Sequence, residues 1–322
     1  MNNTIAAPNS LVEAVKYFSD KEIALTFLAS LRWPEGPVCP KCHGKEHSFL
    51  KTRHVWKCKG CKKQFSAKAG TIFEDSPLGL DKWLPALWLL ANAKNGISSY
   101  ELGRSLGVTQ KTAWFMLHRI RLAMQSKTFS TFRGEVEADE SWIGGRARFM
   151  HADKRKKRVK GRGGFPSGKA AVMGLLERHG PGKHSRVKAQ VIPTVRRRHT
   201  QEIVRNQVEY GSEVFTDELK SYMGLDTAYM HQVINHAESY AEGKVHTNGL
   251  ENFWSLLKRA IRGTYVSVEP FHLFRYLDEQ VYRFNARKTK DVARFINAVA
   301  GVVGRRLTYN KLIGASMNPA TT

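Results

Sequence analysis

Acidic residues at three places in the chain have the types and spacing that could bind a metal ion. Asp139-Glu140 follows a β-like run in GEVEADESWIGG, Asp217-Glu218 follows another in SEVFTDELKSY, and Glu251 lies in HTNGLENFWSLLKR. Carboxylate oxygens are the ligands that Mg²⁺ prefers in proteins. For either doublet taken alone, a solvated strand end or an ion pair with Lys or Arg is the better interpretation. Whether these residues form a metal site or are ordinary surface carboxylates therefore depends on the elements that carry them.

The first doublet ends a run that has the period of a β-strand. Alternation with period two puts Glu135, Glu137 and Asp139 on one face, and Val136 and Ala138 on the other. Further β-like runs, KAAVMGLLER and RVKAQVIPTV, come before the second doublet and are separated by helical stretches. This order predicts an α/β domain with a mixed sheet.

Glu251 lies on a predicted amphipathic helix. At about 100° per residue, one narrow stripe is apolar and must face the core: Leu250, Phe253, Trp254, Leu257 and Ile261. A second stripe beside it is polar: Glu251, Ser255, Lys258 and Arg262, with Asn248 at its edge. A helix packed on the sheet could aim Glu251 at the strand ends that carry Asp139 and Asp217. The alternative is an ordinary surface pair with Lys258, seven residues further on.

The four cysteines lie in one segment near the N-terminus. Their spacing is C-x2-C, fifteen residues and C-x2-C, formed by Cys39, Cys42, Cys58 and Cys61. This spacing predicts a zinc ribbon in which four thiolates complete a closed tetrahedral shell, so that the zinc is structural rather than catalytic. Two disulfides are the alternative, and a reducing cytosol argues against them.

A pair of short helices is predicted after the cysteine segment. LDKWLPALWLLANAKNG has a helical pattern that ends at Gly96, and Ser98 or Ser99 can begin a helix that reaches Leu106. Gly107 then supplies a turn, and Thr109 can cap a second helix. Two such helices suit a helix-turn-helix, in which Thr109, Gln110 and Lys111 would lie near bases or phosphates. An ordinary helical hairpin is the alternative.

The charge of the chain indicates a polyanionic partner. Its 322 residues carry a formal net charge of +24, with a pI near 10.0, and nucleic acid is the commonest partner for such a surplus. No apolar run approaches the ~20 residues that span a bilayer, and the N-terminus lacks the order of a secretory signal. We therefore expect no membrane partner and a cytoplasmic, nucleoid-associated protein.

The motifs ADESWIGG, FTDELKSY and HTNGLENFWSLLKR, in this order, resemble the bacterial insertion-sequence transposases that join a zinc ribbon to a DDE catalytic domain. Glu251 follows Asp217 by 34 residues, which is typical of DDE enzymes, and the likeness runs from about residue 15 to 288. It implies a ribonuclease-H-like fold with Asp139, Asp217 and Glu251 as catalytic carboxylates and Lys258 as the basic residue. Some relatives have Asn as the third residue. Glu251 is favoured because a carboxylate binds Mg²⁺ better than an amide, with Asn248 as a supporting ligand.

The predicted architecture is multidomain, α+β and α/β. It comprises an N-terminal helical segment (1–33), the zinc ribbon (34–68), the helix-turn-helix (69–128), a ribonuclease-H-like mixed sheet flanked by helices (129–290), and a C-terminal helical tail (291–322). A basic insertion at 146–169 contains Lys154, Arg155, Lys156, Lys157 and Arg158. It is expected to clamp the phosphate backbone, although a solvated loop explains the same composition.

These features together predict a transposase. It would bind terminal inverted repeats through the ribbon and the helix-turn-helix, while two Mg²⁺ ions about 3.5–4 Å apart drive cleavage and strand transfer. Arg262 would join Lys258 in contacting the phosphates. The resemblance also implies a homodimer or larger assembly on DNA. Alternatives are a DNA-binding regulator, an inactive transposase derivative, or a metal-dependent nuclease without strand transfer.

Overall fold

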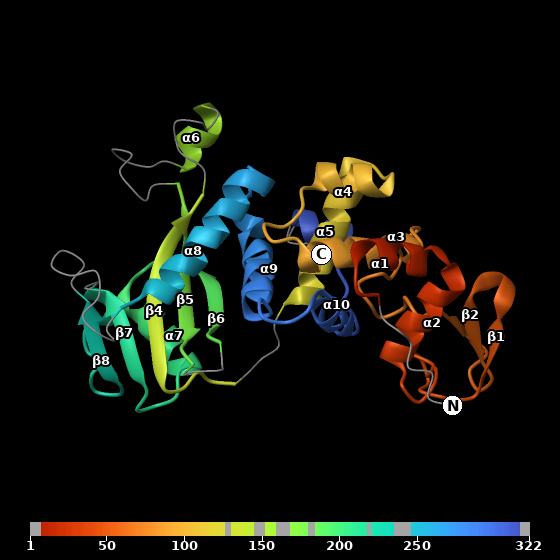
Figure 1. The fold of residues 1–322 in the computed structure, drawn as a ribbon, viewed down its shortest axis with the longest axis horizontal. Helices are drawn as coiled ribbons and strands as arrows, with labels where there is room; N and C mark the ends of the chain where they lie inside the picture. The colour runs from red at the N-terminus through yellow and green to blue at the C-terminus, as the bar shows by residue number, and fades with distance from the viewer. Residues whose placement is uncertain are drawn as a thin grey trace, which may run out of the picture. The chain divides into compact units, whose positions relative to one another are not determined.

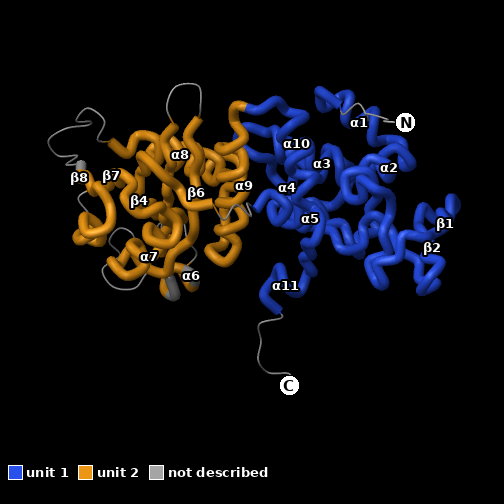
Figure 2. The backbone as a smooth tube through the Cα atoms, turned by 90° about the horizontal axis from the view of Figure 1, so that it is seen from below, with its two compact units in different colours: residues 1–125, 289–322 blue, residues 126–288 orange. Residues whose placement is uncertain are grey.

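The computed structural model describes residues 8–125, 130–144, 152–158, 168–179, 184–217, 220–234 and 246–315. The chain divides into two compact units, which Figure 2 distinguishes by colour. The first unit combines Met1–Gln125 with Thr289–Thr322, and the second is Ser126–Lys288. Within the described ranges, every helix is too short or too polar to cross a membrane.

The first unit begins with two helices and a small sheet. They are α1 (Leu11–Ser19), α2 (Lys21–Arg32), β1 (His47–Leu50), the short helix η1 (Lys51–Arg53), β2 (Val55–Cys58) and β3 (Gln64–Phe65). The three strands are antiparallel in the order β1-β2-β3. The Trp56 ring lies within 5.2–6.0 Å of those of Trp33, Phe49 and Phe65. These aromatic contacts supply the core of a sheet that is otherwise too small to bury one.

The remaining helices of this unit come from both ends of the chain. They are α3 (Leu80–Asn92), α4 (Ser99–Leu106), α5 (Gln110–Met124), α10 (Asp291–Ala300) and α11 (Tyr309–Ile313). Phe295 of α10 is fully buried, and its ring centroid lies 5.1 Å from that of Trp88, 5.6 Å from that of Phe18 and 5.8 Å from that of Phe27. The C-terminal part of the chain therefore completes the core that the N-terminal helices begin.

Helices α4 and α5 have the caps that the sequence predicts. The Ser98 side chain accepts the backbone N–H of Glu101 at 3.1 Å, and the Thr109 side chain accepts that of Thr112 at 3.2 Å. Gly107 ends α4 with φ +63°, a conformation that costs glycine little. The predicted pair of helices with a glycine turn is confirmed.

The second unit is a five-stranded mixed sheet with helices on both faces (Figure 1). Its strands are β4 (Glu135–Ile143), β5 (Ala170–Glu177), β6 (Arg186–Ile192), β7 (Glu213–Asp217) and β8 (Met230–Ile234). The spatial order is β6-β5-β4-β7-β8; β4, β5 and β6 pair antiparallel, whereas β4, β7 and β8 pair parallel. The predicted α/β domain with a mixed sheet is confirmed.

Two helical layers bury the two faces of this sheet. The helical segments of the unit are α6 (Ala152–Arg158), α7 (Arg197–Gln207), η3 (Lys220–Tyr222), α8 (Asn248–Ala260), the π-helical η4 (Ile261–Tyr265), η5 (Pro270–His272) and α9 (Leu273–Asn285). Val136 and Ala138 share a core with Val204 of α7. The opposite core contains the apolar stripe of α8 predicted from the sequence, together with residues of α9. The residues of β4 that alternate with Val136 and Ala138 therefore face α8.

Candidate active site and cysteine cluster

Asp139 lies on β4 beneath α8. Its Oδ2 accepts the indole N–H of Trp254 at 2.9 Å, and its Oδ1 accepts the backbone N–H of Glu140 at 2.7 Å. Trp254 belongs to the apolar stripe of α8, so the contact that packs the helix on the sheet also orients this carboxylate. Sequence reasoning assigned Trp254 to the core and missed its second role as a hydrogen-bond donor.

The other two predicted carboxylates act electrostatically on Asp139. Glu137 pairs with Phe215 in the parallel β4–β7 ladder, and Asp139 and Asp217 are each two residues further along. They therefore stand at matching positions on neighbouring strands, which lie about 4.8 Å apart. Burial, above all, and the charges of Asp217 and Glu251 together raise the pKa of Asp139 to about 6, against two hydrogen bonds that lower it. Glu218, next to Asp217, lies outside the described residues.

A pocket of about 790 Å³ opens over Asp139. Its wall combines carboxyl groups with cationic and neutral side chains: Asp139, Glu140, Ser141, Glu251, Trp254, Ser255, Lys258, Arg259, Arg262 and Gly263. Burial lowers the pKa of Lys258, while the nearby charge of Asp139 opposes that effect. Carboxylates beside a cationic wall suit a ligand that has both a metal ion and a phosphate.

Asn248 and Glu251 occupy different places on α8. Asn248 is the first residue of the helix and is exposed, and it does not line the pocket. Glu251, one turn further on, is half-buried and lines the pocket.

A buried carboxylate on β4 fixes the start of α8. Glu137 is 1% exposed, and its Oε2 accepts the backbone N–H of Leu250 at 2.9 Å, while its Oε1 accepts Nε of Arg178 at 2.7 Å. Thr247, at the N-cap, makes no side-chain cap hydrogen bond. Glu137 thus satisfies a donor that the first turn leaves free and places a negative charge at the positive end of the helix.

Two glycines allow α8 to come this close to the sheet. A Cβ on Gly249 would lie 2.8 Å from both Glu137 Oε2 and Leu176 Cδ1. A Cβ on Gly174 in β5 would lie 2.7 Å from Trp254 Cζ2. Sequence reasoning missed both. The available signal was a glycine within a predicted helix start and another inside a β-like run, where a close backbone approach is a common cause.

A second buried contact joins β4 to the segment that follows β7. The Asp139-Glu140 doublet lies inside β4, which continues to Ile143, so the expectation that it ends a strand is wrong. The Tyr222 hydroxyl, on η3 after β7, donates to Glu140 Oε1 at 2.6 Å, and both side chains are buried. Burial raises the pKa of Glu140 to about 8, so this carboxyl is largely neutral near pH 7. The sequence indicates Glu140 only as part of an acidic doublet and does not predict its pairing with Tyr222.

The four cysteines form a compact cluster in the first unit. Their sulfur atoms all lie within 4.8 Å of one another, and the Cys39–Cys61 and Cys42–Cys58 sulfurs are 3.6 and 3.5 Å apart. These separations exclude disulfides, whose sulfurs are about 2.05 Å apart, and all four cysteines are free. A tetrahedral zinc with bonds of about 2.3 Å requires sulfurs about 3.8 Å apart. The cluster has nearly the dimensions of such a site.

Backbone N–H groups face two of these sulfurs. A hydrogen bond from the backbone of Cys42 lowers the pKa of the Cys39 thiol to about 7. A bond from the backbone of Cys61 likewise lowers the pKa of Cys58. Each C-x2-C loop therefore favours the thiolate form at its first cysteine, which is the form that binds metal.

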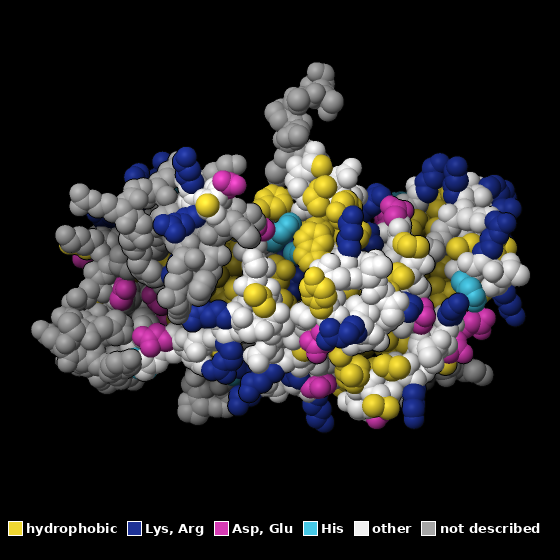
Figure 3. Space-filling model, turned by 90° about the horizontal axis from the view of Figure 1, so that it is seen from above, with side chains coloured by type: hydrophobic (Ala, Val, Ile, Leu, Met, Phe, Trp, Pro, Cys, Tyr) yellow, Lys and Arg dark blue, Asp and Glu magenta, His cyan; other side chains and the backbone are white. Residues whose placement is uncertain are grey.

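The residues predicted to contact DNA are exposed where the structure describes them. Thr109, Gln110 and Lys111 form the exposed start of α5. In the basic insertion, Arg155 and Lys156 of α6 are exposed. The side chains of Lys154, Lys157 and Arg158, and residues 145–151 and 159–167, lie outside the described part of the chain. Figure 3 shows Lys and Arg side chains spread over the face that it presents.

Comparison with known proteins gives two domain matches and two relatives. Residues 131–285 match the ISXO2-like transposase domain, and residues 19–64 match the transposase zinc-ribbon domain. An uncharacterized transposase-like protein of Haemophilus influenzae is 34% identical over 106 residues, covering 33% of this chain and 85% of that protein. An uncharacterized protein in transposable element ISH50 of Halobacterium salinarum is 27% identical over 255 residues, 76% of this chain and 84% of that protein.

A weak likeness in fold is found with a solved transposase structure. It is the Mos1 transposase paired-end complex with left transposon end, at a TM-score of 0.26 and 14% identity, covering 66% of this chain and 78% of that chain. A score this low supports no argument about the present chain.

Proposed function

Because the chain belongs to the insertion-sequence DDE transposases with an N-terminal zinc ribbon, we propose that it binds the terminal inverted repeats of its element and catalyses Mg²⁺-dependent DNA cleavage and strand transfer. One observation carries this proposal. Asp139 and Glu251 line one pocket with Lys258 and Arg262, and the charge of Asp217 on the neighbouring strand acts on the same Asp139 carboxyl.

The carboxyl groups fit a divalent cation. The charges of Asp217 and Glu251 raise the pKa of Asp139, and a cation among the three side chains would offset that repulsion. All of their oxygens are hard donors. Asp139, Asp217 and Glu251 would hold two Mg²⁺ ions. When bound, such ions lower the pKa of an attacking water or 3′-hydroxyl and neutralise charge on the leaving oxygen.

The other groups of the pocket have roles that do not depend on the metal. The Trp254 indole holds Oδ2 of Asp139 in place, and Glu137 sets the position of α8 and thereby of Glu251. Lys258 and Arg262 would bind the phosphates that flank the scissile bond and neutralise charge in the transition state. In-line displacement by water or a 3′-hydroxyl needs no protein nucleophile.

The strand order supports a ribonuclease-H-like assignment for the second unit. Three antiparallel strands are followed by two that run parallel to the first, with the proposed ligands on β4, on β7 and on α8 across the sheet. This arrangement gathers residues far apart in sequence around the middle of β4 and the end of β7.

DNA recognition is proposed for the first unit. Helices α4 and α5 would form a helix-turn-helix that presents Thr109, Gln110 and Lys111 to the major groove. The cysteine cluster would hold one structural zinc, which leaves no ligand position open for catalysis. The basic insertion would contact the phosphate backbone. Double-stranded DNA would be the partner, at both the element ends and the target, and a homodimer or larger assembly would bring two ends together.

The proposal is tested with Asp217→Asn and a matched control, Asp226→Asn, an exposed aspartate of the same unit. DNA carrying the end of the element is incubated with each protein in Mg²⁺ or Mn²⁺, and cleavage and end binding are measured separately. Asp217→Asn should abolish cleavage and retain binding, while Asp226→Asn retains both. Cleavage by Asp217→Asn at the wild-type rate would refute the assignment. Joined products distinguish strand transfer from simple hydrolysis.

A further inference from the structure

Val266, just beyond the pocket, has a strained backbone. Its φ is +59° and its ψ is −54°, and the backbone N–H of Ser267 donates to the carbonyl of Tyr265 at 2.6 Å. A three-residue turn with these angles is rare and strained. A β-branched residue is among the least suited to positive φ. Strain of this kind persists only where the surrounding structure enforces it, and it gathers at functional sites.

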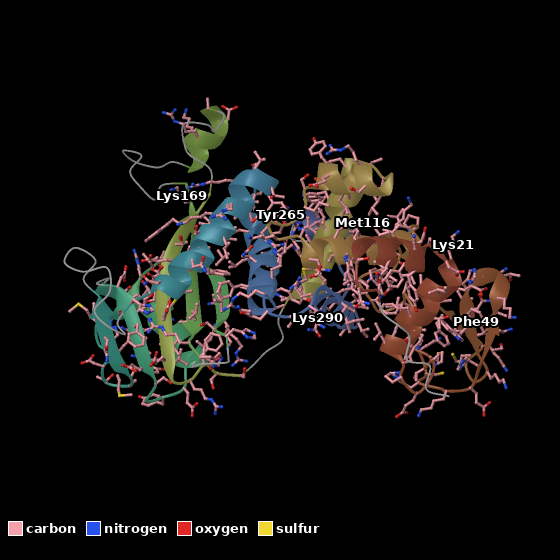
Figure 4. All side chains as sticks on the ribbon, viewed as in Figure 1. Lys21, Phe49, Met116, Lys169, Tyr265 and Lys290 are labelled. Atoms are coloured by element: carbon pink, nitrogen blue, oxygen red, sulfur yellow. The ribbon has the colours of Figure 1, made fainter. Side chains whose placement is uncertain are left out.

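Contacts with α9 hold the residue that precedes Val266 and thereby enforce the turn. The Tyr265 hydroxyl donates to Glu279 Oε1, and the same carboxylate accepts from Arg283. Glu279 is fully buried. The ring of Tyr265, which is labelled in Figure 4, packs edge-on against that of Tyr276 with 4.8 Å between the centroids. The residue before Val266 is thus anchored to α9 by a hydroxyl hydrogen bond to a buried, ion-paired carboxylate and by an aromatic contact.

The Val266 side chain is not buried, so packing contacts do not offset the strain of its backbone. It is 77% exposed, the highest value among the exposed large hydrophobic side chains of the described residues. An ordinary core or packing role therefore does not explain why a valine occupies this turn. Glycine would relieve the strain and lose no buried contact.

The position of Val266 relative to the pocket indicates its partner. Lys258, Arg259, Arg262 and Gly263 form one wall of the pocket. Val266 follows Gly263 by three residues, which can span at most about 10 Å. Bases along one strand are about 3.4 Å apart. A strand whose phosphates contact this basic wall would thus bring a base within about three steps of the Val266 side chain.

Resting on the transposase function proposed above, we propose that Val266 is an apolar wedge that contacts the base step beside the scissile phosphate and unstacks it. Apolar side chains inserted between base steps distort duplexes in this way. The strained turn projects an exposed aliphatic group, and the adjacent cations would hold the DNA backbone on which it acts. The occupant is the DNA end itself, because the apolar tip continues directly from a cationic wall.

The test compares Val266→Gly, Val266→Met and wild type. Tyr210→Ala serves as control, because Tyr210 is 76% exposed and precedes β7, at the opposite end of that strand from Asp217. The probe is a duplex of the element end with 2-aminopurine beside the scissile phosphate, whose fluorescence rises when the base unstacks. Wild type, Val266→Met and Tyr210→Ala should raise the fluorescence several-fold and cleave normally. Val266→Gly should raise it little and cleave at least tenfold more slowly.

Two further measurements separate this proposal from others. Val266→Gly should be at least as stable to urea as wild type, and a mismatch at the flanking base pair should restore its cleavage. Equal fluorescence and cleavage for Val266→Gly and wild type would overturn the wedge and leave the transposase proposal intact. If Val266→Gly loses an oligomeric assembly while its fluorescence stays at the wild-type level, the wedge is also overturned, because the Val266 side chain would then contact protein. A wild type that cleaves no DNA would instead refute the proposed function.

Discussion

Replacing Asp139 with asparagine should stabilise the metal-free protein at neutral and alkaline pH. The pKa of this carboxyl is raised to about 6, first by burial and then by the charges of Asp217 and Glu251. The folded protein therefore binds this proton more tightly than the unfolded chain does. The stability that the bound proton of Asp139 contributes is complete below about pH 4 and is lost as the pH rises through about 6.

The expected magnitude follows from the two pKa values. A rise from near 4 to about 6 corresponds to about 3 kcal/mol of unfolding free energy lost on ionisation. This is an upper value, because Asp139 faces a pocket that admits water. Asparagine carries no charge and retains an oxygen for the indole N–H of Trp254. Asp139→Asn should therefore match wild type near pH 4 and exceed it by up to about 3 kcal/mol at pH 8.

Urea unfolding of zinc-loaded, magnesium-free protein from pH 4 to pH 8 measures this difference. Asp226→Asn, at an exposed position, should show no such dependence on pH. Added Mg²⁺ at a thousandfold excess over its dissociation constant should stabilise wild type by about 4.1 kcal/mol but not Asp139→Asn, which reverses the order of the two stabilities. A variant that is less stable than wild type at pH 8, or a difference that is constant with pH, would refute the reasoning.

Three further substitutions test the supports of the site. Gly249→Ala should lower the unfolding free energy by about 1–3 kcal/mol and slow cleavage, because its Cβ meets two atoms at 2.8 Å. Gly263→Ala, with no atom within 4 Å of the added Cβ, is the control for stability and should leave the urea unfolding unchanged. Trp254→Phe should keep the fold, raise the pKa of Asp139 and weaken Mg²⁺ activation of cleavage, since it removes the 2.9 Å hydrogen bond; an unchanged Mg²⁺ titration would contradict this role. Cys58→Ser should reduce zinc from one ion per chain to none by elemental analysis and abolish end binding, whereas zinc retention would exclude the four-thiolate site.

Local sequence signals predicted the elements that carry the candidate site. The period of residues 135–139 gave the face of β4 that meets α8, and the helical period gave the buried stripe that contains Trp254. The caps at Ser98 and Thr109 were also readable, because each bonds within three residues of itself. Such signals are short-range, so a single sequence contains them in full.

The supports of the site could not be predicted in the same way. Glu137 and Leu250 are 113 residues apart, and Glu140 and Tyr222 are 82 apart. No local periodicity links such pairs, since they meet only once the sheet has formed. The roles of Gly174 and Gly249 depend equally on which side chain the finished fold brings against them.

The division of the chain has a consequence for its synthesis. Residues 126–288 are inserted between two parts of the first unit, and Phe295 reaches the core of that unit only after the insertion has been made. We therefore expect the second unit to fold on the ribosome before the first can be completed. A prematurely terminated chain would lack a finished first unit, so incomplete products would not occupy the ends of the element and block the full-length protein.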